Sequence, residues 1–103
     1  MIVLQIARII SSFIVFLELS DEDTVDPDAA VDMMEGLGSY LDELDKGFLR
    51  ELVDAFAVIA AESTGEVQEV IRDIAHNYYL EEAIAADDPA KLAELDALRD
   101  ARG

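Results

Sequence analysis

The chain has 103 residues, of which 24 are acidic and 7 basic, so its formal net charge is −17 at neutral pH. Hydrophobic residues make up 52% of the sequence, which is too many for an intrinsically disordered chain. The acidity excludes direct binding to nucleic-acid phosphates and argues against docking on an anionic membrane, because both need clustered Lys and Arg. The absence of cysteine excludes disulfides, thiolate catalysis and cysteine-based zinc sites. The length predicts one domain over residues 1–103.

The most apolar segment, residues 2–19, is predicted to be a core helix. Gln5, Arg8 and Glu18 interrupt it, which argues against a membrane span, and a positive charge inside the run argues against a secretory signal. Five large apolar residues recur near one helical face: Ile2, Ile6, Ile9, Phe13 and Phe16. We expect this face to be buried, either at the centre of the fold or in a homodimer. The β-branched content of the segment leaves a strand as the alternative.

Apolar periodicity predicts further helices over residues 27–44, 47–62, 65–79 (with a continuation to 86 left open) and 89–101. Asp26-Pro27 and Asp88-Pro89 are helix-start signals, since Asp caps a helix and Pro suits its first position. Short connections favour antiparallel neighbours. The predicted fold is therefore an all-α bundle of four or five mostly antiparallel helices.

The acidic residues are unevenly distributed along the chain. From Ile9 to Asp45 there is no basic residue, and this span holds eleven acidic ones. Because adjacent like charges repel, a bundle that needed only solubility could have mixed its signs. The span is interpreted either as a solvated face or as a surface that meets a basic partner.

A pair of tyrosines ends the predicted fourth helix. Helical spacing places Tyr78 on the apolar stripe, where a core role is expected, while Tyr79 lies about 100° away around the helix. An exposed tyrosine beside carboxylates is typical of the anchors in interface hot spots. Asp73 precedes Tyr78 by five positions, on the polar side of the same helix.

These features resemble the immunity proteins of bacterial toxin systems, of which the colicin DNase immunity proteins are the best known. The resemblance covers residues 26–79: an acidic helix upstream, then Asp73, Tyr78 and Tyr79. The aspartate lies farther from the tyrosines than in that family, and Leu80 stands where the family has a proline. The resemblance implies a small acidic protein that blocks a basic toxin, with Asp73, Tyr78 and Tyr79 as contact residues.

Catalytic and metal sites are weakly indicated. Asp73 and His76 have the spacing of a carboxylate–histidine metal pair. With one histidine in the chain, a monomer cannot supply the two such motifs of a di-iron bundle, whereas a symmetric dimer could. The same spacing fits an exposed histidine paired with Asp73. An EF-hand loop begun at Asp21 would need Gly at its sixth and Glu at its twelfth position, where the chain has Asp26 and Asp32. We expect no catalytic residue, no metal and no cofactor.

The sequence thus predicts a cytoplasmic, non-catalytic, acidic protein-binding module, most plausibly a bacterial immunity protein that neutralises a basic, nuclease-like toxin. The alternatives are a structural or regulatory homodimer held by the first helix, and a DNA mimic that inhibits a nucleic-acid-binding protein. Direct nucleic-acid and membrane binding are not expected. The predicted partner-binding residues lie on the second and fourth helices: Asp28, Asp32, Glu35, Asp42, Asp73, Tyr78 and Tyr79.

Overall fold

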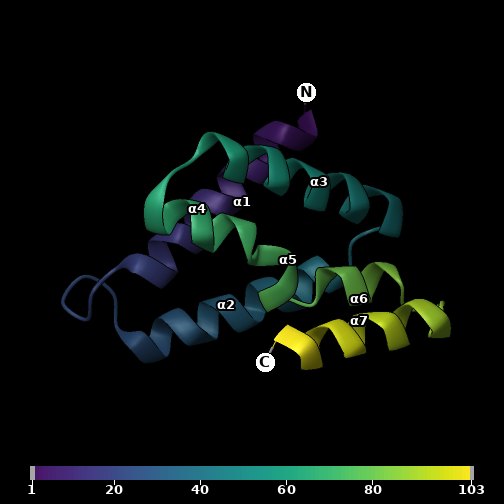
Figure 1. The fold of residues 1–103 in the computed structure, drawn as a ribbon. Coiled ribbons are helices and arrows are strands. Elements are labelled where there is room, and N and C mark those ends of the chain that lie inside the picture. Colours follow the sequence, from purple (N-terminus) through teal and green to yellow (C-terminus); the bar gives the residue numbers. More distant parts are fainter. Residues whose placement is uncertain (1, 103) are drawn as a thin grey trace.

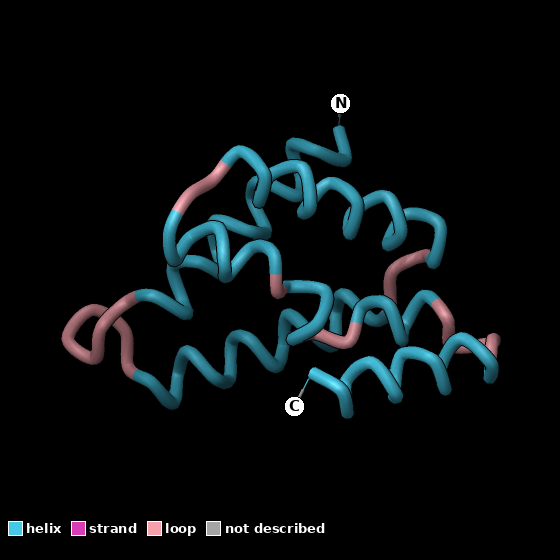
Figure 2. The backbone as a smooth tube through the Cα atoms, viewed as in Figure 1, coloured by secondary structure: helices cyan, strands magenta, loops and turns pink. Residues whose placement is uncertain are grey.

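The computed structural model describes residues 2–102, and this part of the chain consists of helices joined by loops and turns, without a strand (Figures 1 and 2). Its helices are α1 (Ile2–Leu19), α2 (Pro27–Asp42), α3 (Lys46–Glu62), α4 (Gly65–Arg72), α5 (Ile74–Asn77), α6 (Leu80–Ile84) and α7 (Pro89–Arg102). The all-α class predicted from the sequence is confirmed, and the apolar first segment is a helix rather than a strand.

Aspartate caps define where three of the helices begin. The Asp26 carboxylate accepts a hydrogen bond from the Ala29 backbone N–H at 3.0 Å, with Pro27 in the first turn. The Asp45 carboxylate accepts from the Phe48 N–H at 3.1 Å. At the start of α7, Asp88 does the same for the Lys91 N–H at 3.1 Å. Each cap satisfies a backbone donor that the helix itself leaves free.

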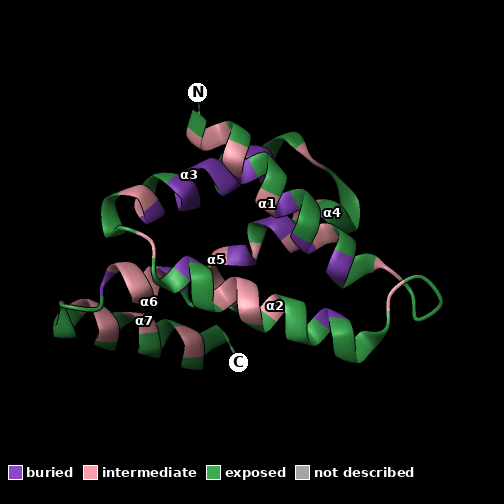
Figure 3. Cartoon of the chain, turned by 180° about the vertical axis from the view of Figure 1, so that it is seen from behind, coloured by how far each residue is buried: buried purple, intermediate pink, exposed green. Residues whose placement is uncertain are grey.

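The core is centred on α3, which contacts α1, α4 and α6. Seven residues of α3 are buried on the side that faces these neighbours (Figure 3): Leu49, Leu52, Val53, Ala55, Phe56, Ile59 and Ala60. Ile14 from α1, Ile74 from α5 and Leu80 from α6 are buried in the same cluster. Helices far apart in sequence therefore share a single apolar core.

α1 packs with the opposite face from the one predicted. Its buried residues are Ala7, Ser11, Ile14 and Leu17. Ile2 and Ile9 are each 71% exposed and Phe16 is 51% exposed, so the predicted core face is wrong for the single chain. The physical reason is that α1 is apolar almost all round, and its small residues allow the closer approach to α3. The buried Ser11 hydroxyl donates to the Arg8 carbonyl oxygen at 3.2 Å, which satisfies it.

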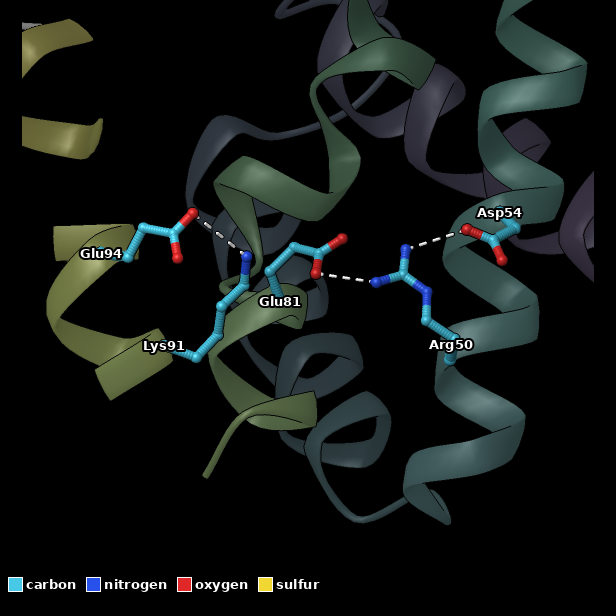
Figure 4. Close-up of polar contacts among 5 residues, drawn as sticks. All are labelled: Arg50, Asp54, Glu81, Lys91 and Glu94. Atoms are coloured by element: carbon cyan, nitrogen blue, oxygen red, sulfur yellow. Dashed lines mark hydrogen bonds and ion pairs between the residues drawn. The ribbon is translucent and has the colours of Figure 1, made fainter. Parts of the chain in front are cut away.

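The predicted fourth helix is broken into three short pieces. α4 ends at Arg72, and Asp73 alone separates it from α5. Tyr78 and Tyr79 separate α5 from α6, and Tyr79 has the left-handed backbone conformation (φ 56°, ψ 37°) that non-glycine residues rarely adopt. This break turns the chain so that α6 reaches back to α3, where Arg50 binds Glu81 at 2.8 Å and Asp54 at 2.9 Å (Figure 4).

α7 lies on the outside of the molecule and has no buried residue. Polar contacts attach it to α5, α6 and the α4–α5 break: Arg99 binds Glu82 at 2.6 Å, and Arg102 binds Asp73 at 3.0 Å. A pair within α7, Lys91 with Glu94 at 3.5 Å, is exposed (Figure 4). Arg99 and Arg102 therefore help to hold α7, whose apolar residues Leu92 and Leu95 are only half-buried.

Candidate functional site

An open groove of about 520 Å³ lies between α2, the end of α1 and the α5–α6 break. α2 runs beside α5 and α6 in this part of the fold (Figure 1). The lining combines apolar, polar and acidic side chains: Glu18, Val31, Met34, Glu35, Gly38, Ser39, Asp42, Asn77, Tyr78 and Tyr79. Three of these residues are acidic and none is basic.

Tyr78 forms the floor between α2 and the α5–α6 break. Its ring lies against Gly38, where a Cβ atom would be only 3.3 Å from the Tyr78 Cδ1. The Tyr78 hydroxyl is buried and has no hydrogen-bond partner among the described residues. Burial, with a smaller contribution from the charge of Glu18, raises the pKa of Tyr78 to about 12. Tyr78 is therefore a packed aromatic residue whose hydroxyl is neutral at physiological pH.

Tyr79 is the exposed aromatic residue of the groove. Its side chain is at the rim, with the residue 56% exposed. The guanidinium of Arg99 lies over its ring at 3.7 Å from the centroid. That guanidinium also binds both carboxylate oxygens of Glu82, at 2.6 and 3.1 Å, and donates to the His76 carbonyl oxygen at 2.7 Å. The ring of Tyr79 is thus held in place before any partner binds.

The charge of the groove comes from Glu18, Glu35 and Asp42. Glu18, at the end of α1, has its pKa raised by partial burial and by the nearby negative charge of Asp73. A carboxylate with a raised pKa is one whose charge is poorly compensated by its surroundings. A cation entering the groove would supply that compensation.

Of the seven predicted contact residues, the groove brings together Glu35, Asp42, Tyr78 and Tyr79. Asp28 and Asp32 are exposed near the start of α2 and lie outside the lining. Asp73 is also outside it and is engaged by Arg102 at 3.0 Å and Arg72 at 3.9 Å. The structure therefore gathers four of the seven predicted residues in the groove. The other three are carboxylates outside the groove that are either exposed or ion-paired.

The sequence reasoning did not identify Glu18 or the apolar wall of Val31 and Met34. Glu18 is the single acidic residue in the apolar first helix, and that isolation was the available signal. Val31, Met34 and Gly38 follow one another at spacings of three and four, so they share a face of α2. The sequence therefore predicts that these residues form a stripe on α2. It does not predict which segment of the chain this stripe faces.

His76 is not paired with Asp73 as a metal pair or a helical ion pair. Both ring nitrogens of His76 lie 3.2–3.3 Å from Nη1 of Arg99. Among residues 2–102, no three His, Asp or Glu side chains come together as a group that could hold a metal ion. The groove thus combines an aromatic residue held by Arg99, an apolar wall and three carboxylates.

No protein-family model, curated protein or solved structure matches the chain. In the described part of the chain, α1 is the one helix long and apolar enough to cross a membrane, a test that core helices and N-terminal signal sequences also pass.

Proposed function

We propose that this protein is a non-catalytic acidic binding module that neutralises a basic, nuclease-like bacterial toxin. The observation that carries the proposal is the groove between α2 and the α5–α6 break. It joins a pre-positioned tyrosine, an apolar wall and three carboxylates without a basic residue in its lining. An arginine or lysine of the partner has there carboxylates to bind, and the exposed part of Tyr79 gives its aliphatic stem a surface to pack against.

The proposed mechanism is occupation of the partner's cationic surface. Enzymes that act on nucleic acids bind phosphates through Lys and Arg, so their clefts are basic. The net charge of −17 would attract such a surface over distance and raise the association rate. Tyr79 and the apolar wall would then exclude water at the centre of the interface, with Glu35 and Asp42 contributing the charged contacts. Substrate would be excluded sterically and electrostatically, with no chemical step.

We also make a proposal for how the helices are arranged and for where the protein is located in the cell. We infer that α4, α5 and α6 act as one interrupted limb, so that the chain forms a mostly antiparallel bundle of four or five helical units. The short breaks between these helices support this description. We also propose a cytoplasmic location, where an inhibitor would meet a nuclease before it reaches nucleic acid.

The test is affinity capture from a lysate of the source organism with matched charge variants. The groove variant is Glu18→Gln, Glu35→Gln and Asp42→Asn. The control variant is Glu51→Gln, Glu66→Gln and Asp96→Asn, which removes the same three charges from exposed positions outside the groove. Capture is run at about 0.15 M and about 0.5 M salt, between which the Debye length falls from about 8 Å to about 4 Å.

The expected result is one basic protein that is retained by the wild type and the control, lost with the groove variant, and reduced at high salt. That protein should be toxic to cells or degrade nucleic acid, and the captured complex should lack that activity. Equal loss with both variants would contradict a specific groove, since it would mean that only net charge matters. Capture of a harmless nucleic-acid-binding protein would contradict toxin neutralisation and favour a DNA mimic.

A further inference from the structure

The outer face of α1 carries large apolar side chains that the fold leaves uncovered. Ile2, Ile9, Phe13, Phe16 and Leu19 are all exposed large hydrophobic residues. The exposed area of each of these side chains is on the order of 100 Å², so the five together expose roughly 500 Å². Contiguous patches of this size on a monomer usually mark an interaction site.

The spacing of this face is that of a helix-pairing surface. Ile2, Ile6, Ile9, Phe13 and Phe16 alternate four and three residues apart. We call these five residues the α1 seam; four of them are exposed, and Ile6 is half-buried at its edge against the core. A 4-3 alternation keeps one stripe facing a partner helix along its whole length. The opposite face of α1 (Ala7, Ser11 and Ile14) is buried against the core, so the helix stays in place while the seam remains available.

Charge argues for what covers the seam. The chain has net charge −17, so two copies repel almost everywhere on their surfaces. From Ile2 to Leu17, however, α1 has no acidic residue, and its one charge, Arg8, is bound to Glu62 at 2.8 Å. The seam is therefore the surface on which a second acidic copy meets the least repulsion. Two such faces bury about 1,000 Å², close to the lower limit for a specific interface.

We propose that this protein forms a homodimer in which the α1 seams of two copies pack antiparallel, with Ile9 at the crossing point. The antiparallel direction of the two helices follows from the acidic residues at the end of α1 and in the loop after it. Glu18 and the loop residues Asp21, Glu22 and Asp23 would lie side by side in a parallel pair. In an antiparallel pair they are separated by about the 27 Å length of an 18-residue helix, well beyond the Debye length of about 8 Å.

The dimer leaves the groove free. The seam residues are not part of the groove lining, so partner binding and dimerisation use different surfaces. The two also depend on salt in opposite directions. Added salt weakens attraction to a basic partner, whereas it screens the repulsion between two acidic copies and strengthens the dimer.

The test is sedimentation velocity of the purified full chain across a concentration series. The expected result is a species of twice the 11.3 kDa chain mass in the micromolar range, strengthened by salt. Ile9→Glu should weaken association by at least about 100-fold, because it places two carboxylates in a closing apolar seam. Met33→Glu, at an exposed apolar position on α2 outside the groove lining, is the matched control and should dimerise like the wild type.

Engineered cysteines test the direction of pairing in this cysteine-free chain. Ile9→Cys should crosslink to itself under mild oxidation. Phe16→Cys should not, because the two residues would be about 21 Å apart in the antiparallel pair, far beyond the roughly 7 Å limit for a disulfide. A mixture of Ile2→Cys and Phe16→Cys should form the mixed crosslink. Self-crosslinking of Phe16→Cys would contradict the antiparallel arrangement.

The dimer proposal is overturned if the wild type stays monomeric at about 100 µM, far above a micromolar dissociation constant. It is also overturned if Ile9→Glu and Met33→Glu have equal effects. Neutral phosphatidylcholine vesicles provide the remaining test: binding of the monomer to vesicles, abolished by Ile9→Glu, would show that the seam meets lipid and not a second copy. Neither result changes what the groove variants are expected to show. The dimer proposal can therefore fail while the partner-binding proposal stands, and the reverse.

Discussion

Arg99 of α7 lies over the ring of Tyr79, 3.7 Å from its centroid, and so connects the outermost helix to the rim of the groove. The same guanidinium binds Glu82 through two hydrogen bonds and reaches the His76 carbonyl oxygen. Hydrogen bonding to Arg99 lowers the pKa of Glu82, which indicates a pair that favours the folded state. Tyr79 therefore keeps its rare backbone conformation with side-chain support from another helix.

Replacing Arg99 should release α7 and loosen Tyr79. Arg99→Ala removes a partly buried bidentate pair and a cation–π contact, so we expect a loss of about 2–3 kcal/mol in the free energy of unfolding. Arg99→Lys should lose about 1–2 kcal/mol, because an ammonium cannot reproduce the planar fork. Urea unfolding measures both. Lys91→Ala is the control: its exposed pair with Glu94 is worth at most about 0.5 kcal/mol, and an equal loss there would contradict the role of Arg99.

The two glycines of α2 should respond differently to alanine. Nothing lies within 4 Å of a Cβ built on Gly36, so Gly36→Ala should stabilise the protein by about 0.5–1 kcal/mol through helix propensity. At Gly38 the same Cβ lies 3.3 Å from the Tyr78 ring, so Gly38→Ala should gain less or lose stability. Thermal unfolding of the pair measures this difference. Equal stabilisation would mean that α2 and Tyr78 are not in close contact.

Removal of the Tyr78 hydroxyl should stabilise the fold. Tyr78→Phe keeps the ring and deletes a buried group without a partner among the described residues, which is worth about 1 kcal/mol or more. Because the pKa of Tyr78 is raised to about 12, the unfolded chain releases this proton at lower pH than the folded protein. Stability should therefore fall as pH rises from about 10 to about 12.

Ultraviolet absorbance of tyrosinate, recorded as the pH is raised, measures the ionisation of the Tyr78 hydroxyl directly. The wild type should show a late-titrating fraction near pH 12 that is missing in Tyr78→Phe. If both proteins give the same titration curve, Tyr78 is not buried as described.

Neutralising Glu18 should stabilise the protein at neutral pH and not in acid. Its pKa is raised in the folded state, so the folded protein binds this proton more tightly than the unfolded chain. Stability contributed by Glu18 therefore falls as pH rises from its ordinary value through the folded pKa. Glu18→Gln should exceed the wild type in stability above that window and match it below, in urea unfolding at a series of pH values.

Glu51→Gln, at an exposed position on α3, is the control for Glu18→Gln. It removes the same charge from a more open site and should give a smaller difference. A larger effect at Glu51 would show that net repulsion, and not the environment of Glu18, dominates.

Local signals in the sequence predicted the helices well where chain chemistry determines them. Asp26-Pro27 and Asp88-Pro89 mark helix starts because capping and proline geometry act within one turn. The breaks at Asp73 and at Tyr78-Tyr79 have no glycine or proline to signal them. They arise from packing, since α6 must return to α3 and Arg99 must reach Tyr79.

The buried face of α1 and the lining of the groove could not be predicted in full, because both depend on contacts between segments that are distant in the sequence. Because α1 is apolar almost all round, its stripe of large residues does not identify the face that packs on the core. The small residues Ala7 and Ser11 lie on that face instead. In the groove, Glu35 and Asp42 were predictable as acids seven residues apart on one side of α2. Glu18 was not, because only the tertiary fold brings the end of α1 to that place.

The measurement that tests the central claim most directly is an amide hydrogen-exchange footprint of the captured partner on this protein. The account predicts added protection along residues 31–42 of α2 and around Tyr78 and Tyr79, with little change on α3 or α7. The affinity should fall by at least about tenfold with Tyr79→Asn, which tolerates the left-handed backbone but lacks the ring. It should be unchanged with Tyr40→Asn, on an exposed tyrosine of α2 outside the groove. Protection confined to other surfaces, or equal losses with both variants, would contradict the groove as the binding site.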